Sequence, residues 1–176
     1  MSLALYFVVV FVIAVPLALF EDWGITHYGV GWGEPLPPDK PWAKNIIIKT
    51  PFNAVGWQLL TRYHFCTYLM IVPAAVAVLR YVLESRIQHA AVNWIGWLTF
   101  MIAGTMGVMA LEDFLFFVFS TVIGKPYPGA LARVFRGEAI WHGQLDLGFT
   151  RFPALYVVLP AVITIVLFFG FRFGVR

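Results

Sequence analysis

Two adjacent acidic residues, Glu112 and Asp113, lie inside one of the most apolar stretches of the sequence, residues 102–123. Ionisable side chains at this depth in a membrane-spanning helix are costly to keep there, and they typically mark functional sites. A buried carboxyl group can donate a proton to a substrate as a general acid, and it can also bind a metal ion. The sequence therefore predicts Glu112 and Asp113 as catalytic residues.

Three histidines could complete a metal site with these acids. Two imidazoles with one or two carboxylates form a ligand set suited to iron, zinc or manganese. The predicted ligands are His64, Glu112 and His142. Asp113 or His27 would act as a fourth ligand or would orient the others. No HExxH, ExxH or CxxC spacing accompanies them, so this transition-metal site is predicted from residue types and from their depth alone.

A purely structural explanation of the acidic pair stays open. Adjacent side chains on a helix point about 100° apart, so one acid should face the interior and the other an adjacent seam or Arg62. A carboxylate paired with Arg62 would be an ion pair that only neutralises a buried charge. A lone histidine inside a membrane is more often a helix contact than a ligand, so His64 alone decides little.

The elements that must position these residues follow from composition. Hydrophobic residues make up 61% of the 176 and charged residues 12%, and the mean hydropathy is +0.82. A spanning helix needs about 20 apolar residues, and four stretches qualify, at about 3–20, 56–81, 92–123 and 152–171. Their apolar runs are continuous and do not alternate as in a β-barrel. We therefore predict an all-α, integral membrane four-helix bundle that forms one domain over residues 1–176.

Four spans would place both termini on one side of the bilayer and two long loops, residues 21–55 and 124–151, on the other. Basic residues are densest in the short flanks on the side of the termini, which predicts that both termini are cytoplasmic. These residues, Arg80, Arg86, Arg172 and Arg176, are expected to be interfacial anchors. The second span would descend from the loop side and the third would climb back. At a rise of about 1.5 Å per residue, His64 and the acidic pair then share one depth, beneath the two loops.

Other features bound the class of protein. The formal net charge of +3 comes without any Lys/Arg run, so no nucleic-acid partner is expected. The single Cys66 excludes a disulfide framework within the chain and is expected to be a small core residue. No basic residue precedes the first apolar run, so we expect a span there and not a secretory signal. The seven Trp and seven Tyr are expected to form interfacial belts.

Small residues recur on the third predicted helix, at Ala103, Gly104, Gly107 and Ala110. Such spacing allows two helices to approach closely. The partner helix could be the second span, which would bury the region of Glu112, or it could belong to another subunit or a second copy of the chain.

The tract Ala-Leu-Glu-Asp-Phe-Leu-Phe-Phe at residues 110–117 resembles the motif Pro-x-Glu-Glu-x-x-Phe-Phe of the membrane-integral lycopene cyclase domain. That resemblance implies that Glu112 and Asp113 would be the acid pair that protonates a polyene. It also implies that Phe116 and Phe117 would line the path of the cation. The tract has alanine where the family has proline, and the chain holds one copy of a motif that the family uses in two halves.

With Trp141-His142 downstream of the Glu-Asp-Phe-Leu tract, the chain is also similar to a group of uncharacterised small membrane proteins. Three functional hypotheses follow. The first is a metal-binding membrane protein with redox or lipid-modifying chemistry. The second is an accessory or structural subunit of a larger membrane complex, and the third, implied by the resemblance, is an isoprenoid cyclase subunit.

Overall fold

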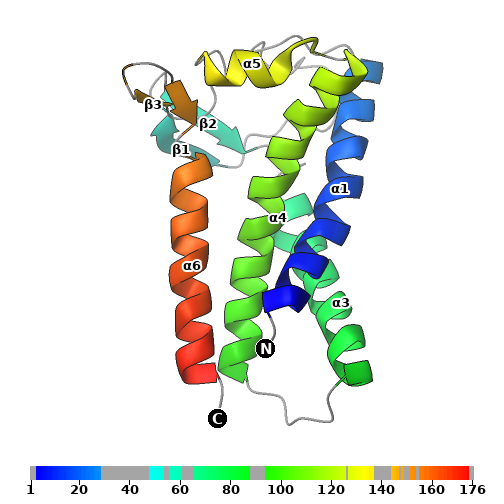
Figure 1. Ribbon diagram of the computed structural model, residues 1–176, viewed down its shortest axis with the longest axis vertical. Coiled ribbons are helices and arrows are strands. Elements are labelled where there is room, and N and C mark those ends of the chain that lie inside the picture. Colours follow the sequence, from blue (N-terminus) through cyan, green and yellow to red (C-terminus); the bar gives the residue numbers. More distant parts are fainter. Residues whose placement is uncertain are drawn as a thin grey trace.

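The computed structural model describes residues 3–28, 48–53, 56–60, 66–87, 94–125, 127–136, 144–146, 148, 151–153 and 155–174. Long helices stand side by side along most of the molecule, and short elements cover one end of them (Figure 1). The long helices are α1 (Leu3–Tyr28), α3 (Val72–Ile87), α4 (Trp94–Ile123) and α6 (Leu155–Gly174). The predicted helical fold class is thus confirmed for the described residues.

Two antiparallel strand pairs and a short helix belong to the two long connections. Strand β1 (Ile48–Asn53) pairs with β2 (Gly56–Leu60), and β3 (Gln144–Asp146) pairs with β4 (Arg151–Pro153). The short helix is α5 (Ala130–Phe135). All five elements lie at the end of the helices that is opposite to the C-terminus (Figure 1). The described parts of both connections therefore share one end, as the sequence predicts.

The predicted start of the second span at residue 56 is wrong. Residues Gly56–Leu60 form β2, and the helical segment begins at Cys66. A short apolar run is compatible with a strand or with a helix, and periodicity alone does not separate the two; here pairing with β1 gives a strand. Cys66 is exposed, so its expected place in the core is also wrong.

A π-helical turn, η1 (Thr67–Ile71), leads into α3. The backbone N–H of Val72 bonds to the carbonyl oxygen of Thr67, five residues earlier. Pro73 follows directly and has no N–H to donate. Proline disturbs the hydrogen bonding of the preceding helical turn, and π-type turns are one common form of such an irregularity. The helical segment is therefore interrupted just before Pro73 by this wide turn.

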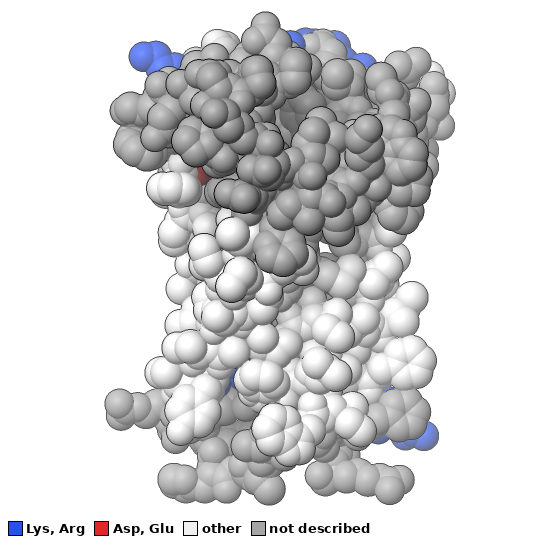
Figure 2. Space-filling model, turned by 180° about the vertical axis from the view of Figure 1, so that it is seen from behind, with Lys and Arg blue, Asp and Glu red and all other residues white. Residues whose placement is uncertain are grey.

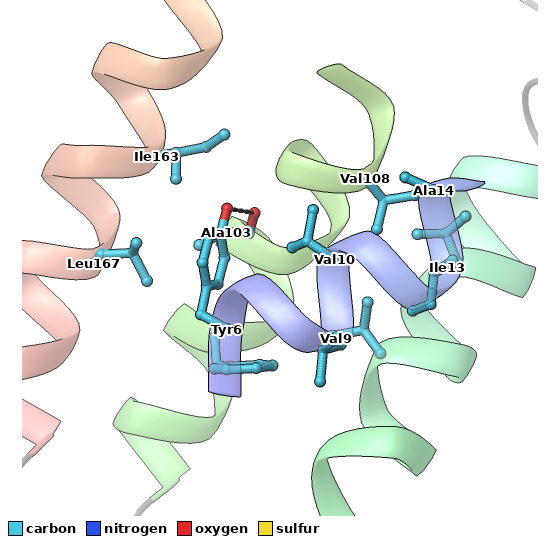
Figure 3. Close-up of a cluster of buried hydrophobic side chains, with 12 residues drawn as sticks. Tyr6, Val9, Val10, Ile13, Ala14, Ala103, Val108, Ile163 and Leu167 are labelled. Carbon is cyan, nitrogen blue, oxygen red and sulfur yellow. Dashed lines mark hydrogen bonds between the residues drawn. The ribbon is translucent and has the colours of Figure 1, made fainter. Parts of the chain in front are cut away.

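Helix α4 is the central element, since α1, α3 and α6 all pack against it and α1 also contacts α3. The main core cluster lies among these helices (Figure 3). Its fully buried members include Val9, Val76, Phe100 and Val108, and Leu167 of α6 closes one side. Buried apolar residues of α1, α3 and α6 thus converge on one long helix, α4, which carries the acidic pair.

The small residues of α4 are used for contacts within the chain. A Cβ atom on Gly107 would overlap the hydroxyl group of Tyr6 on α1, and one on Gly104 would lie 2.9 Å from Cγ1 of Val76 on α3. The Tyr6 hydroxyl donates a 3.1 Å hydrogen bond to the carbonyl oxygen of Ala103 (Figure 3). The close helix approach is confirmed, with α3 as the partner at Gly104 and α1 as the partner at Gly107.

Two helical segments, Leu3–Glu21 and Trp94–Ile123, are long and apolar enough to cross a membrane. The segments Thr67–Leu83 and Tyr156–Gly170 are apolar but shorter. Large apolar side chains are exposed along these helices, for example Phe7 at 60% and Phe168 at 63%. On the face shown in Figure 2, the described surface between the two ends is almost free of charge, and Lys and Arg colour both ends.

Arg80 is not the interfacial anchor that its position in the sequence indicates. Its side chain is only 5% exposed, and Nη1 donates a 2.7 Å hydrogen bond to the carbonyl oxygen of Gly96. The guanidinium carbon lies 4.8 Å from the centre of the Phe100 ring. Arg80 therefore joins α3 to the start of α4.

Candidate functional site

Glu112 is buried where α1, η1 and α4 meet, with 1% of its surface exposed. The hydroxyl group of Tyr68 in η1 donates a hydrogen bond of 2.5 Å to its Oε2 atom. The carboxyl group of Glu21 on α1 is close enough to interact with it. Its Oε1 atom is buried and has no hydrogen-bond partner of regular geometry among the described residues. One oxygen of Glu112 is thus held in place, and the other keeps its capacity to bind a proton or a cation.

Asp113 points toward α6. Its Oδ2 atom accepts a 2.5 Å hydrogen bond from the hydroxyl group of Tyr156. The Tyr156 ring packs edge to face against Phe114, with ring centres 5.9 Å apart. Glu112 and Asp113 therefore face different neighbouring helices, as the 100° step between adjacent helical residues predicts. Each carboxyl group is bonded by a tyrosine that belongs to another element.

An apolar groove of about 830 Å³ runs between α1 and α6 along the surface of α4. Gly107 and Ala110 lie in its lining together with Phe114, so the small residues of α4 also leave space here. Tyr156 lines the groove as well. The hydroxyl group that holds Asp113 is therefore part of a side chain at the wall of a cavity that could accept an apolar molecule.

Phe116 and Phe117, which the family resemblance places along a cation path, have another position. Both are buried in a second core cluster with Ala18, Tyr127, Ala130 and Val134, beneath α5. Their rings contact each other with centres 5.3 Å apart, and Phe116 also contacts Tyr127. Neither residue is among those lining the groove. In this structure the two phenylalanines are core residues that join α4 to α5.

The predicted metal ligands are only partly placed. His64, His142 and the predicted ion-pair partner Arg62 lie outside the described residues, and so does the side chain of His27 on α1. Among the side chains that the structure does describe, no group of three or more His, Cys, Asp or Glu is placed to hold a metal ion. The depth predicted for His64 rests on a helix starting at residue 56. That premise is lost, because the helical segment begins later.

Sequence reasoning missed Tyr68 and Tyr156, which it assigned to the interfacial belts. They lie 44 and 43 residues from the acids that they contact. The available signal is that a tyrosine within an apolar helix needs a partner for its hydroxyl group. Buried carboxyl groups are suitable partners, but the sequence does not indicate which tyrosine reaches which acid.

Comparisons of the chain with protein-family models, curated proteins and solved structures find no match. The function is therefore inferred from the geometry of the site.

Proposed function

We propose that the chain is an integral membrane protein in which Glu112 and Asp113 form an acid–base site for a lipid-soluble substrate. One observation carries this proposal. Two neighbouring carboxyl groups on α4 are each bonded by a tyrosine hydroxyl from a different element, and one of these tyrosines, Tyr156, lines an apolar groove.

The exterior of the helices supports the membrane setting. Large apolar side chains project from α1, α4 and α6. Exposed basic residues lie near the helix ends, with Lys125 after α4, Arg136 after α5 and Arg172 near the end of α6. In water such an apolar surface would be unfavourable. In a bilayer it would face hydrocarbon, and the basic residues would reach the headgroups.

The chemistry that this arrangement supports is proton transfer through a tyrosine. Tyr156 lines the groove, whereas Asp113 lies behind it and accepts its hydrogen bond. A substrate in the groove would exchange a proton with the Tyr156 hydroxyl group. Asp113, which accepts a hydrogen bond from the same hydroxyl group, would take up or return a proton in turn. Positioned acid–base groups typically accelerate reactions by about 10²–10⁴-fold. Tyr68 and Glu112 form a second pair of the same kind, deeper among the helices.

Lipid analysis of cells that express the chain would test this proposal. Mass spectra of total lipid extracts are compared for wild type, Asp113→Asn, Tyr156→Phe and an empty vector. We expect some lipid species to differ in abundance between cells with wild type and cells with the empty vector. These differences should be absent in both variants. Val122→Ala is a matched control, because Val122 is 79% exposed on α4 and lies outside the groove lining. Identical lipid profiles for wild type and vector, at verified expression, would contradict the proposal.

A second candidate, metal binding, is favoured by one feature of Glu112. Its Oε1 atom is buried and has no hydrogen-bond partner of regular geometry among the described residues, and the Glu21 carboxyl group is close enough to interact with Glu112. Facing carboxylates are good ligands for iron, zinc or manganese when imidazoles complete the set, and His27, His64 and His142 would supply these.

Metal analysis of purified protein tests this second candidate. Stoichiometric metal in wild type that is lost in Glu112→Gln and in His64→Ala would support it. Folded wild-type protein that takes up no iron, zinc or manganese on addition of these ions would eliminate it.

A further inference from the structure

The groove between α1 and α6 has a shape and a polarity that define its ligand more closely. We propose that it binds a single hydrocarbon chain with a neutral hydroxyl head, a long-chain alcohol, whose hydroxyl group donates a hydrogen bond to Oη of Tyr156. This inference rests on the proposed acid–base function and names the class of its substrate.

The dimensions of the groove fit one chain. Its lining on α6 extends from Tyr156 to Phe168, which is about 18 Å at about 1.5 Å per residue. The hydrocarbon layer of a bilayer is about 30 Å thick, so the half that belongs to one leaflet is only slightly shorter than the groove. The groove therefore matches the length of one lipid chain within one leaflet, and its volume of about 830 Å³ is typical of sites that bury most of a small ligand.

The hydroxyl groups of the lining are already used as donors. Tyr6 donates to the carbonyl oxygen of Ala103 at 3.1 Å, Tyr156 donates to Asp113 at 2.5 Å, and Thr164 donates to the carbonyl oxygen of Pro160 at 2.7 Å. Besides its one proton, a hydroxyl group has two lone pairs through which its oxygen can accept hydrogen bonds. A complementary ligand therefore brings its own donor, as an alcohol does.

The charges around the groove exclude anionic heads. The described lining contains no Lys or Arg, and the carboxyl group of Asp113 lies directly behind Tyr156. A phosphate or carboxylate head at this place would be desolvated without a cation and would lie near another carboxyl group, and both effects are unfavourable. A neutral hydroxyl head carries neither penalty. The polarity thus favours a long-chain alcohol over a phospholipid or a fatty acid.

Photolabelling tests the inference with two probes that differ only in the head. The probes are 1-hexadecanol and hexadecanoic acid, each with a diazirine in mid-chain, added to the full chain in lipid nanodiscs under conditions where the acid is ionised. Labelled peptides are mapped by mass spectrometry. We expect label on residues 107–114 and 156–168, with the alcohol labelling about tenfold more than the acid, a difference of about 1.4 kcal/mol.

Matched variants identify the groove as the site. Ala110→Phe should fill the floor of the groove and reduce labelling by the alcohol by about tenfold. Ala74→Phe makes the same change at an exposed position on α3 and should leave labelling as in wild type. Thr164→Phe, at an exposed position of the lining, repeats the test if Ala110→Phe does not fold. Tyr156→Phe should still admit the hydrocarbon chain but should label less with the alcohol, because the hydroxyl group that accepts its hydrogen bond is removed, whereas the acid should stay the poorer probe because Asp113 remains.

Three results would overturn the inference. They are equal labelling by acid and alcohol in wild type, labelling unchanged in folded Ala110→Phe and Thr164→Phe, and cross-links showing that a second copy of the chain covers the groove. The proposed function fails in a different way. If labelling is selective but lipid extracts do not change with wild type, the acid–base proposal is wrong and the groove assignment stands. If extracts change while labelling is unselective, only the groove assignment is wrong.

Discussion

The hydroxyl group of Tyr6 on α1 lies directly against Gly107 of α4, at a point where any Cβ atom would overlap it. The same hydroxyl group donates a hydrogen bond to the carbonyl oxygen of Ala103, one turn earlier on α4. The contact between α1 and α4 therefore depends on the absence of a side chain at residue 107. It also fixes one wall of the apolar groove, since Tyr6 and Gly107 both line it.

Gly107→Ala should destabilise the protein by about 1–3 kcal/mol, because the added methyl group overlaps the Tyr6 hydroxyl and the helices must separate. Thermal unfolding in detergent, followed by circular dichroism, measures the effect. Combining it with Tyr6→Phe should recover part of the loss, because the next atoms, Cγ2 of Val10 and Cζ of Tyr6, would lie at 3.1 and 3.2 Å. An unfolding midpoint for Gly107→Ala equal to that of wild type would contradict this contact.

Double-mutant cycles should separate the two acid–tyrosine pairs. We expect a coupling free energy of about 1 kcal/mol between Tyr68→Phe and Glu112→Gln, and a similar value between Tyr156→Phe and Asp113→Asn, because each pair shares a hydrogen bond. The crossed combination of Tyr68→Phe with Asp113→Asn should be additive within about 0.5 kcal/mol. The measurement is unfolding in mixed micelles. Crossed coupling as large as direct coupling would show that the acids share one network.

Arg80→Lys should destabilise the junction of α3 and α4 by about 1–3 kcal/mol. A lysine at this site loses the planar guanidinium group that lies over the Phe100 ring and bonds to Gly96. Arg172→Lys is the matched control, since Arg172 is exposed on α6, and it should change stability by less than about 0.5 kcal/mol. Equal midpoints for the two variants would show that Arg80 contributes only its charge.

Gly170→Ala should loosen α6 from the start of α4, because its Cβ atom would lie 2.5 Å from Oγ1 of Thr99. The expected loss is about 1–3 kcal/mol. Thr99→Ala in the same chain should relieve most of it by removing the atom in the way. Limited proteolysis provides the measurement, with faster cleavage of Gly170→Ala than of the double variant. Equal cleavage rates for the two chains would contradict the predicted overlap.

The sequence was sufficient to predict those features that depend on the regular geometry of a single helix. The different directions of Glu112 and Asp113 follow from the helical repeat, and the close approach at Gly104 and Gly107 follows from the size of the residues. The start of the second helix could not be predicted, because residues 56–60 pair with β1, and such pairing is a tertiary contact. Arg80 was assigned to the interface, because the sequence does not show that a carbonyl group and an aromatic ring lie within its reach.

In the candidate site, too, features within one segment could be predicted, whereas contacts between distant segments could not. The acids were identified from their unusual surroundings within one segment. Their tyrosine partners lie more than 40 residues away in the chain and are brought close only when the helices pack together. No local pattern records such a pairing.

The π-helical turn before α3 has a consequence for how this chain tolerates insertions and deletions. A π turn holds one residue more than an α turn, so deleting one residue from Thr67–Ile71 would restore regular winding. The shortened chain would gain ordinary hydrogen bonds, and the segments on either side would keep nearly the same relative rotation, because the wide turn already absorbs the extra residue. A deletion within the regularly wound α3 would instead rotate the preceding segment by about 100° and would take Tyr68 away from Glu112.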